Sequence, residues 1–527
     1  MGPCKGMRRW AAAMLVLFAL PFSPLAAADE RQELEALRAT TLKLIQLLVQ
    51  EGVLTQEKAN ALIKEAGAAA PPPSAQAKPA VRVPYMPQAV KDDITNQLRE
   101  EVIATAKAER WADPGRLPEW ADRLALDGDL RFRWQHDFLD KNNAPPAFFQ
   151  ALGQNINNTT EDRNRLRLRA RLNVKAKVND EVEAAIGLAT GTQGSTGNPA
   201  STNNTLGDSF NRQVAGFDLA YVAWRPFGGM IDWGHRDALT LTGGRFRNPF
   251  LASDLVWAPD LNFDGVIAAL RPSFGELWRP FMVLGAFPLK ENEPDPTQPT
   301  RKNKWLYGYQ GGLEWGYPSG LVLRGAAAYY DYRNIAGIPN TDPLNPNAND
   351  WSAPQFRQHG NTLFPINLAG NPALFGLASQ FRIVNLVGEA GFRYDEFRRL
   401  TLTADWAKNV GFDSSEIDNR TGGVLAGLQA RTNALQYRAQ FGHVLIERRW
   451  DWFAYGAYKR VERDAVLDAF VEGDFNLGGT NAKGWIVGGG LGVGRNAWLG
   501  LKYTTANQID GPPLAIDTFM LDFNARF

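Results

Sequence analysis

Beyond Asp122, apolar and polar residues alternate along the chain with a period of two. In RLRLRARLNVKAKV, apolar side chains stand at Leu166, Leu168 and Leu172, and basic side chains fill most of the positions between them. Successive side chains of a β-strand face opposite sides of the sheet, so this pattern predicts strands with one apolar and one polar face. A soluble sandwich and a membrane barrel both produce such alternation, and the pattern alone does not separate them.

The joins between the predicted strands separate the two architectures. Short turns near Asn179, Pro318, Asp395 and Arg495 alternate with long polar segments, the longest of which covers about residues 333–380. Short turns on one side and long loops on the other are the rule for outer-membrane barrels, whose strand number is usually even. The sequence therefore predicts an all-β transmembrane protein, an antiparallel β-barrel of roughly 16 strands, over residues 122–527.

The chain ends inside a predicted strand. In FMLDFNARF, Phe519, Leu521, Phe523 and Phe527 share the apolar face. Unpaired backbone groups in lipid are costly, so the last strand of a barrel must pair with the first. We expect the barrel to close at this terminal strand.

The residues before the barrel have a helical period. Leu34, Leu37, Leu44 and Leu48 follow a heptad pattern, which predicts a helical segment over 29–67, either a helical hairpin or an oligomerising coiled coil. Residues 68–84 are rich in Pro and Ala and predict a semi-rigid linker. Residues 85–121 predict an amphipathic periplasmic helix and a connector to the barrel.

The first residues predict export. Basic residues in MGPCKGMRR precede the apolar stretch WAAAMLVLFAL and the small residues of SPLAAADE, which is the order of a secretory signal peptide. We expect residues 1–28 to be removed, together with Cys4, the single cysteine of the chain. No later segment is apolar for long enough to predict a membrane-spanning helix. The predicted location is the outer membrane, with an N-terminal periplasmic segment.

Several longer stretches carry a family resemblance. They are QEGVLTQEKANALIKEA, VRVPYMPQAVKDDITNQLREEV, AERWADPGRLPEWADRLALDGDLRFRWQ and GNTLFPINLAGNPALFGLASQFR. With the terminal Phe527, the chain resembles the proteobacterial family described as putative porins. The resemblance implies an outer-membrane diffusion channel that forms a homotrimer. It does not imply which solute the channel transports. The terminal aromatic also looks like the signal that the barrel insertion machinery recognises.

A barrel of about sixteen strands is wide enough to enclose water, and the charges on its inner face then govern selectivity. The strand pattern places a ladder of basic residues on that face. The pore-lining candidates are Arg131, Arg133, Arg165, Arg167, Arg169, Arg171, Lys175, Lys177, Arg324, Arg393 and Arg438. Two hypotheses remain open: a net positive field that weakly prefers anions, or ion pairs with carboxylates such as Asp127 and Asp129 that stiffen the wall.

The long segment 333–380 contains apolar anchors, including Trp351, Phe364 and Phe375. Long loops without regular structure are usually functional or disordered. The anchors favour a loop folded into or over the barrel mouth, and the alternative is an exposed surface loop.

Motifs for chemistry are scarce. The four histidines show no metal-ligand spacing, and no thiol remains after cleavage, so we expect no cofactor, no metal and no enzyme activity. A net charge of +1 gives no support for nucleic-acid binding. Trp452, Tyr455 and Tyr458 are interpreted as part of an aromatic girdle.

Partners and alternative functions follow from the predicted location. The expected surroundings are outer-membrane lipid and lipopolysaccharide. One alternative function is a structural tether, in which the N-terminal helices hold peptidoglycan. Another is a barrel enzyme that acts on lipid.

Overall fold

The computed structural model describes residues 123–191, 197–226 and 238–527, apart from 273, 276, 297, 299, 317–319 and 368–372. The predicted signal peptide, the helical segment, the linker and the residues 85–121 lie outside the described residues. Over the part that is described, no helix combines the length and apolarity that a membrane crossing needs.

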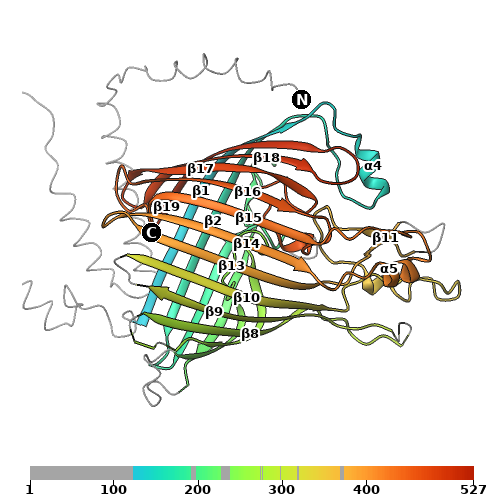
Figure 1. Cartoon of the computed structure of the whole chain (residues 1–527), viewed down its shortest axis with the longest axis horizontal. Helices are drawn as coiled ribbons and strands as arrows, with labels where there is room; N and C mark the ends of the chain where they lie inside the picture. Colours follow the sequence, from blue (N-terminus) through green and yellow to red (C-terminus); the bar gives the residue numbers. More distant parts are fainter. Residues whose placement is uncertain are drawn as a thin grey trace, which may run out of the picture. The chain divides into compact units, whose positions relative to one another are not determined.

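Sixteen antiparallel strands close into one barrel, which confirms the predicted fold class (Figure 1). Strands that follow one another around the barrel are hydrogen-bonded, and β1 pairs with both β2 and β19. A two-residue strand, β4 (Asn204–Thr205), extends the edge of β2. The barrel strands are β1 (Leu124–Leu139), β2 (Arg163–Lys177), β3 (Val182–Thr190), β5 (Ala215–Trp224), β6 (Leu239–Arg247), β7 (Asn262–Leu270), β8 (Trp278–Lys290), β9 (Lys304–Gly316), β10 (Leu321–Arg333), β13 (Arg382–Arg393), β14 (Arg398–Asn409), β15 (Asn433–His443), β16 (Trp452–Val461), β17 (Ala482–Gly494), β18 (Ala497–Gln508) and β19 (Ala515–Arg526).

The alternation along β1 sorts its side chains between lipid and lumen. Leu130, Phe132 and Trp134 are exposed on the outer surface, whereas Arg133 and Gln135 are almost completely buried. A hydrocarbon exterior cannot satisfy polar groups, so the polar set must face the interior of the barrel. The period-two pattern of the sequence therefore becomes the division between the two faces of the wall.

The barrel closes where the chain ends. Phe527 donates its backbone N–H to the carbonyl of Gly128 (3.1 Å), and the N–H of Gly128 donates to the carbonyl of Phe527 (3.0 Å). A Cβ atom added at Gly128 would lie 2.5 Å from the Phe527 ring. Glycine is required at this position because the terminal ring occupies the space of a side chain.

Connections differ between the two ends of the barrel. The turn end has short joins such as 178–181, 394–397 and 495–496, and the loop end has long ones such as 140–162 and 334–381. Two joins break the alternation: 225–238 is long on the turn end, and 509–514 is short on the loop end. Figure 1 shows α4, α5 and β11 at the end opposite the C-terminus. The small elements of the loop end are α4 (Pro146–Ala151), α5 (Ser414–Thr421), β11 (Leu363–Pro365), β12 (Phe375–Leu377) and the 3₁₀ turns Asp350–Ser352 and Asp468–Phe470.

The connection between β6 and β7, residues 248–261, folds into the barrel, and we call it the first inserted loop. Asp254 forms an ion pair with Lys459 on β16 (2.9 Å). Asp260 forms an ion pair with Arg169 on β2 (3.2 Å). Because β2 and β16 lie on different parts of the wall, one loop can contact both only by crossing the lumen.

The connection between β16 and β17, residues 462–481, also folds inward, and we call it the second inserted loop. Its Asp474 reaches Arg133 on β1 (2.7 Å). The two inserted loops meet where the backbone N–H of Ala258 donates to the carbonyl of Phe470 (2.8 Å). Together the two loops narrow the interior of the barrel.

The main hydrophobic core lies between these loops and the inner wall. Leu255 of the first inserted loop and Val466 of the second are fully buried. The Trp257 ring packs edge-on against Tyr330 on β10, with ring centroids 5.0 Å apart. Apolar packing of this kind holds the inserted loops in place, since a loop in water would lose the burial energy.

Candidate functional site

The basic ladder predicted from the sequence lies on the inner faces of β1 and β2. In the strand register, Arg131 stands opposite Arg169, and Arg133 stands opposite Arg167. Like charges directly across a strand pair are destabilising. The ladder therefore needs negative charge from elsewhere in the barrel.

Carboxylates on β1 itself supply part of that charge. Asp129 on β1 binds both Arg169 (2.8 Å) and Arg171 (2.7 Å). Asp137, also on β1, binds Arg165 (2.5 Å). The hypothesis of paired arginines is correct for these positions.

The inserted loops and β19 supply further negative charge. Asp260 lies 3.2 Å from Arg169 and 3.4 Å from Arg171. Arg133 is held between Asp474 of the second inserted loop and Asp522 on β19, both at 2.7 Å. Each loop is thus fixed to the ladder by a partly dehydrated ion pair, which leaves a costly unpaired charge if one partner is removed.

Two arginines of the ladder are bound to neutral groups instead. Arg131 donates to the amide oxygen of Asn203 (2.6 Å), and Arg167 donates to that of Gln135 (3.0 Å). Among the residues that the structure describes, neither has a carboxylate within ion-pair distance. These two guanidinium groups are the members of the ladder that hydrogen-bond neutral side chains and make no direct ion pair with a described carboxylate.

A second charge cluster joins the two inserted loops to the wall. Lys459 lies between Asp254 (2.9 Å) and Glu472 (3.4 Å), and Lys502 binds Glu472 (2.6 Å) and Asp474 (3.3 Å). Burial raises the pKa of Glu472 to about 7, against the attraction of Lys502. Burial alone would also raise the pKa of Asp254, but the charge of Lys459 outweighs it and holds that pKa well below its ordinary value.

A cavity of about 300 Å³ lies between the ladder and the inserted loops. Its described lining holds five arginines and three acidic residues, so positive charge is in excess. The lining residues are Arg131, Arg163, Arg165, Arg167, Arg169, Ala200, Ser201, Asn203, Pro259, Asp260, Glu472, Gly473, Asp474 and Leu477. We call this cavity the constriction.

A larger cavity of about 750 Å³ lies toward the turn end, beneath the first inserted loop. Among its described lining residues, basic side chains again outnumber acidic ones. The basic residues are Lys175, Arg225, Arg247, Arg271, Arg279 and Arg324, and the acidic ones are Glu183 and Glu314. We call this cavity the vestibule.

Lys175 and Lys177 lie near the turn end of β2. Lys175 is 3.6 Å from Asp127, and Lys177 is 2.7 Å from Asp180 in the adjoining turn. Arg393 is the exposed last residue of β13 and lines neither the constriction nor the vestibule. The structure therefore brings the arginines of β1 and β2 together on one face, but not every candidate approaches the narrow part.

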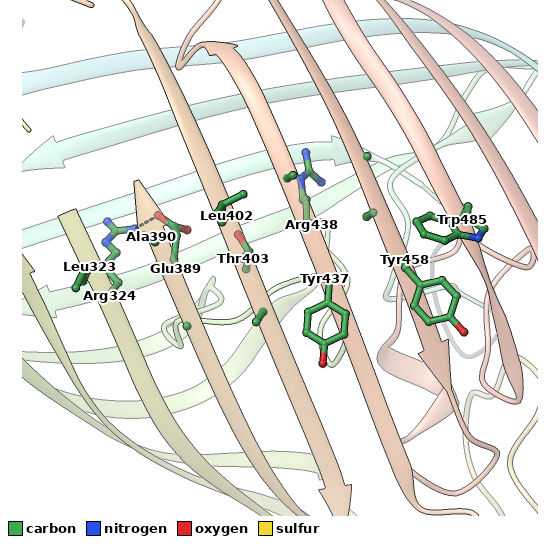
Figure 2. Close-up of a pocket in the computed structure, with 15 residues that line it drawn as sticks. Leu323, Arg324, Glu389, Ala390, Leu402, Thr403, Tyr437, Arg438, Tyr458 and Trp485 are labelled. Atoms are coloured by element: carbon green, nitrogen blue, oxygen red, sulfur yellow. Dashed lines mark ion pairs between the residues drawn. The ribbon is translucent and has the colours of Figure 1, made fainter. Parts of the chain in front are cut away.

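A row of charged residues runs across the inner wall from β8 to β15. Arg324 lies 2.7 Å from Glu314 and 3.7 Å from Glu389, and Arg279 lies 3.0 Å from Glu314. The strand register continues this row through Thr403 to Arg438. Figure 2 shows the ion pair between Arg324 and Glu389, with Thr403 and Arg438 on the next two strands. We call these six residues, five charged ones and Thr403, the charge row.

One aromatic prediction is wrong. Tyr455 does not belong to an outer girdle, because it faces the lumen, where Arg438 lies 3.9 Å above its ring. A Cβ atom added at Gly488 on the adjacent strand would lie 2.6 Å from the Tyr455 hydroxyl. The ring thus fills the space that an inward-facing glycine leaves. Tyr458 points away from the Arg438 side of the wall, as Figure 2 shows.

The long segment 334–381 packs against the second inserted loop. Asn361 donates to the carbonyls of Arg463 (2.5 Å) and Val466 (2.9 Å), and Thr362 donates its hydroxyl to Asp464 (2.6 Å). Its residues do not appear in the described lining of the constriction. The two inserted loops were not predicted from the sequence, although the apolar content of LVWAPDL was a signal for the first.

Comparison with known families decides the assignment. The family profile described as "Putative porin" matches residues 38–527. The chain belongs to this porin family. It is therefore an outer-membrane channel protein, and family and fold point to a channel rather than an enzyme.

Solved porin structures resemble the chain at low sequence identity. OprB of Pseudomonas putida is 12% identical, with a TM-score of 0.45, over 78% of this chain and 96% of that one. The outer-membrane channel DcaP of Acinetobacter baumannii is 8% identical, with a TM-score of 0.41, over 77% and 97%. OmpF of Salmonella typhi is 10% identical, with a TM-score of 0.40, over 77% and 97%. No curated protein matches the chain.

Proposed function

We propose that this porin is a passive diffusion channel for small hydrophilic solutes or ions, with a weak preference for anions. The observation that carries the proposal is that Arg131 and Arg167 line the constriction, bind neutral side chains and have no direct ion pair with a described carboxylate. The basic excess in the vestibule has the same sign. A solute that crosses the barrel therefore meets positive potential at two successive levels.

Physical chemistry explains why the preference is weak. The remaining arginines of the ladder are neutralised by Asp129, Asp137, Asp260 and the second inserted loop. Salt at about 0.15 M screens charges over about 8 Å. Two unpaired guanidinium groups then favour anions over cations without excluding cations from a water-filled passage.

The test is a reversal-potential measurement in planar bilayers under a KCl gradient. We expect a potential of the sign that indicates faster chloride passage. The double variant R131Q/R167Q should lose most of this preference. R393Q, which removes an exposed arginine outside both cavities, is the matched control and should leave it unchanged. Clear cation preference of the wild type would refute the proposal.

We also propose the assembly that the family resemblance implies. The barrel forms a homotrimer in outer-membrane lipid and lipopolysaccharide, and the insertion machinery recognises Phe527. In this proposal the N-terminal periplasmic segment also holds peptidoglycan, so that the protein acts as a tether as well as a channel. Removal of residues 29–67 should then release the cell wall from the barrel while conductance is kept.

A further inference from the structure

We propose that Arg131 and Arg167 form a binding subsite for small carboxylates inside the constriction. This inference rests on the proposed channel function and goes further by naming a class of solute. It predicts saturable binding at two identified side chains, whereas a positive field alone would favour every anion.

The two guanidinium groups belong to one site. Arg131 on β1 lies two residues from Arg133, and Arg133 stands directly opposite Arg167 on β2. Diagonal neighbours of this kind lie about 7–8 Å apart at Cα, within reach of long side chains. Both arginines also line the same cavity of about 300 Å³. One small ligand can therefore contact both.

The acidic residues of the constriction are already occupied. Asp260 binds Arg169 and Arg171 and accepts hydrogen bonds from Thr202, from its N–H at 3.2 Å and its hydroxyl at 2.9 Å. Asp474 and Glu472 are likewise held by the basic residues described above. The direct ion pairs of these carboxylates over the described residues are with other cations, so the guanidinium N–H donors of Arg131 and Arg167 remain for a mobile anion.

The hydrogen-bonding capacity of the two arginines points to an oxyanion. Each guanidinium group carries five N–H donors. Arg131 and Arg167 each make one side-chain hydrogen bond, and over the described residues their buried Nε atoms have no partner. Buried donors without partners are costly. A planar carboxylate can accept two parallel hydrogen bonds from one guanidinium fork, which a halide ion cannot do.

The size of the constriction limits the ligand. A volume of about 300 Å³ is at the lower end of the range for small-molecule sites. The subsite therefore fits short carboxylic acids.

The experiment uses the full-length protein in planar bilayers. Sodium acetate is added at constant ionic strength while the chloride current is recorded. We expect the chloride current to fall with acetate concentration and to saturate. R131Q and R167Q should each raise the half-saturating concentration about tenfold or more, because a charge-assisted hydrogen bond is lost. The control R393Q should behave as the wild type.

Lysine variants separate the subsite from a general field effect. R131K and R167K keep the charge but lose the planar fork, so they should weaken acetate binding while the KCl reversal potential stays near the wild-type value. A linear acetate response in the wild type would overturn the subsite, and so would lysine variants that bind acetate as the wild type does. Saturation by inorganic phosphate at lower concentration than acetate would overturn the assignment to carboxylates. The reversal potential tests the channel proposal independently of all three outcomes.

Discussion

The ion pairs of Asp260 give the sharpest test of how the first inserted loop shapes the channel. The substitution D260N keeps the size of the side chain and the oxygen that accepts from Thr202, but it removes the charge shared by Arg169 and Arg171. Burial alone would raise the pKa of Asp260, yet the neighbouring arginines, Arg169 foremost, lower it below its ordinary value. The wild-type side chain is therefore ionised at neutral pH.

The magnitude follows from the surroundings of the ion pairs. The side chains of Asp260, Arg169 and Arg171 are 11%, 14% and 26% exposed. Removing one partner of a buried ion pair costs about 3–5 kcal/mol. Because both arginines keep Asp129, we expect the lower end of that range, about 3 kcal/mol. That amount corresponds to roughly a hundredfold increase in the equilibrium constant for detachment of the Asp260 end of the loop from the ladder.

Two readouts follow in planar bilayers. The reversal potential of D260N should shift further toward anion preference, because one negative charge is gone, and the single-channel conductance should rise, because the loop opens. D264N is the control, since Asp264 is 57% exposed and pairs with Arg245 away from the ladder. If D260N matches D264N in both measurements, or shifts toward cations, the assigned role of the loop is wrong.

Three further predictions concern assembly and stability. G128V should reduce the heat-modifiable folded form on gels, because the new side chain would collide with the Phe527 ring, whereas G388A should fold normally, because a Cβ atom there meets no atom within 4 Å. Burial raises the pKa of Asp468 to about 7, so the folded state holds this proton more tightly than the unfolded state. The contribution of Asp468 to stability should therefore fall as pH rises from about 4 to about 7, by up to about 4 kcal/mol. The difference in stability between the wild type and D468N should change by that amount in urea titrations that follow tryptophan fluorescence in detergent. The opposite slope from buried His359, whose pKa is lowered to about 4, is common to both proteins and cancels in the difference. N361A should leave the Val466 carbonyl and the Asp468 N–H of the second inserted loop without these partners, and the Arg463 carbonyl with only the Thr480 hydroxyl of its two side-chain donors, which should speed proteolysis within 462–481 and raise conductance; unchanged cleavage would contradict the role of this contact.

The barrel could be predicted from the sequence because strand alternation is a local property. The position of a residue within a strand decides which face its side chain lies on. Leu130, Arg131 and Phe132 could therefore be assigned to faces without knowledge of their partners. The same rule could have corrected the girdle prediction. Tyr455 lies three positions from both Trp452 and Tyr458, and an odd separation puts it on the opposite face.

The inserted loops could not be predicted because they have no period. Residues 248–261 contain apolar side chains at irregular spacing, and nothing local shows whether such a segment folds inward or lies over the rim. Their acidic residues, Asp254 and Asp260, acquire partners on β16 and β2 only once the barrel is closed. The strand pattern therefore predicts that the arginines of the ladder share one face. The carboxylates of the inserted loop that pair with basic residues reach them only through tertiary structure.

The charge row has a consequence for how the strands find their alignment. Hydrophobic alternation forbids a slip of one residue, because it would turn every arginine into the lipid, but it permits a slip of two. Sliding β10 by two residues against β9 would leave Arg324 opposite Gly312 or Gly316 instead of Glu314. Sliding it against β13 would leave Arg324 opposite Val387 or Gly391 instead of Glu389. A slip of two residues keeps the apolar outer face of the barrel unchanged. It is nevertheless disfavoured, because it separates the ion pairs on the water-facing inner side of the wall.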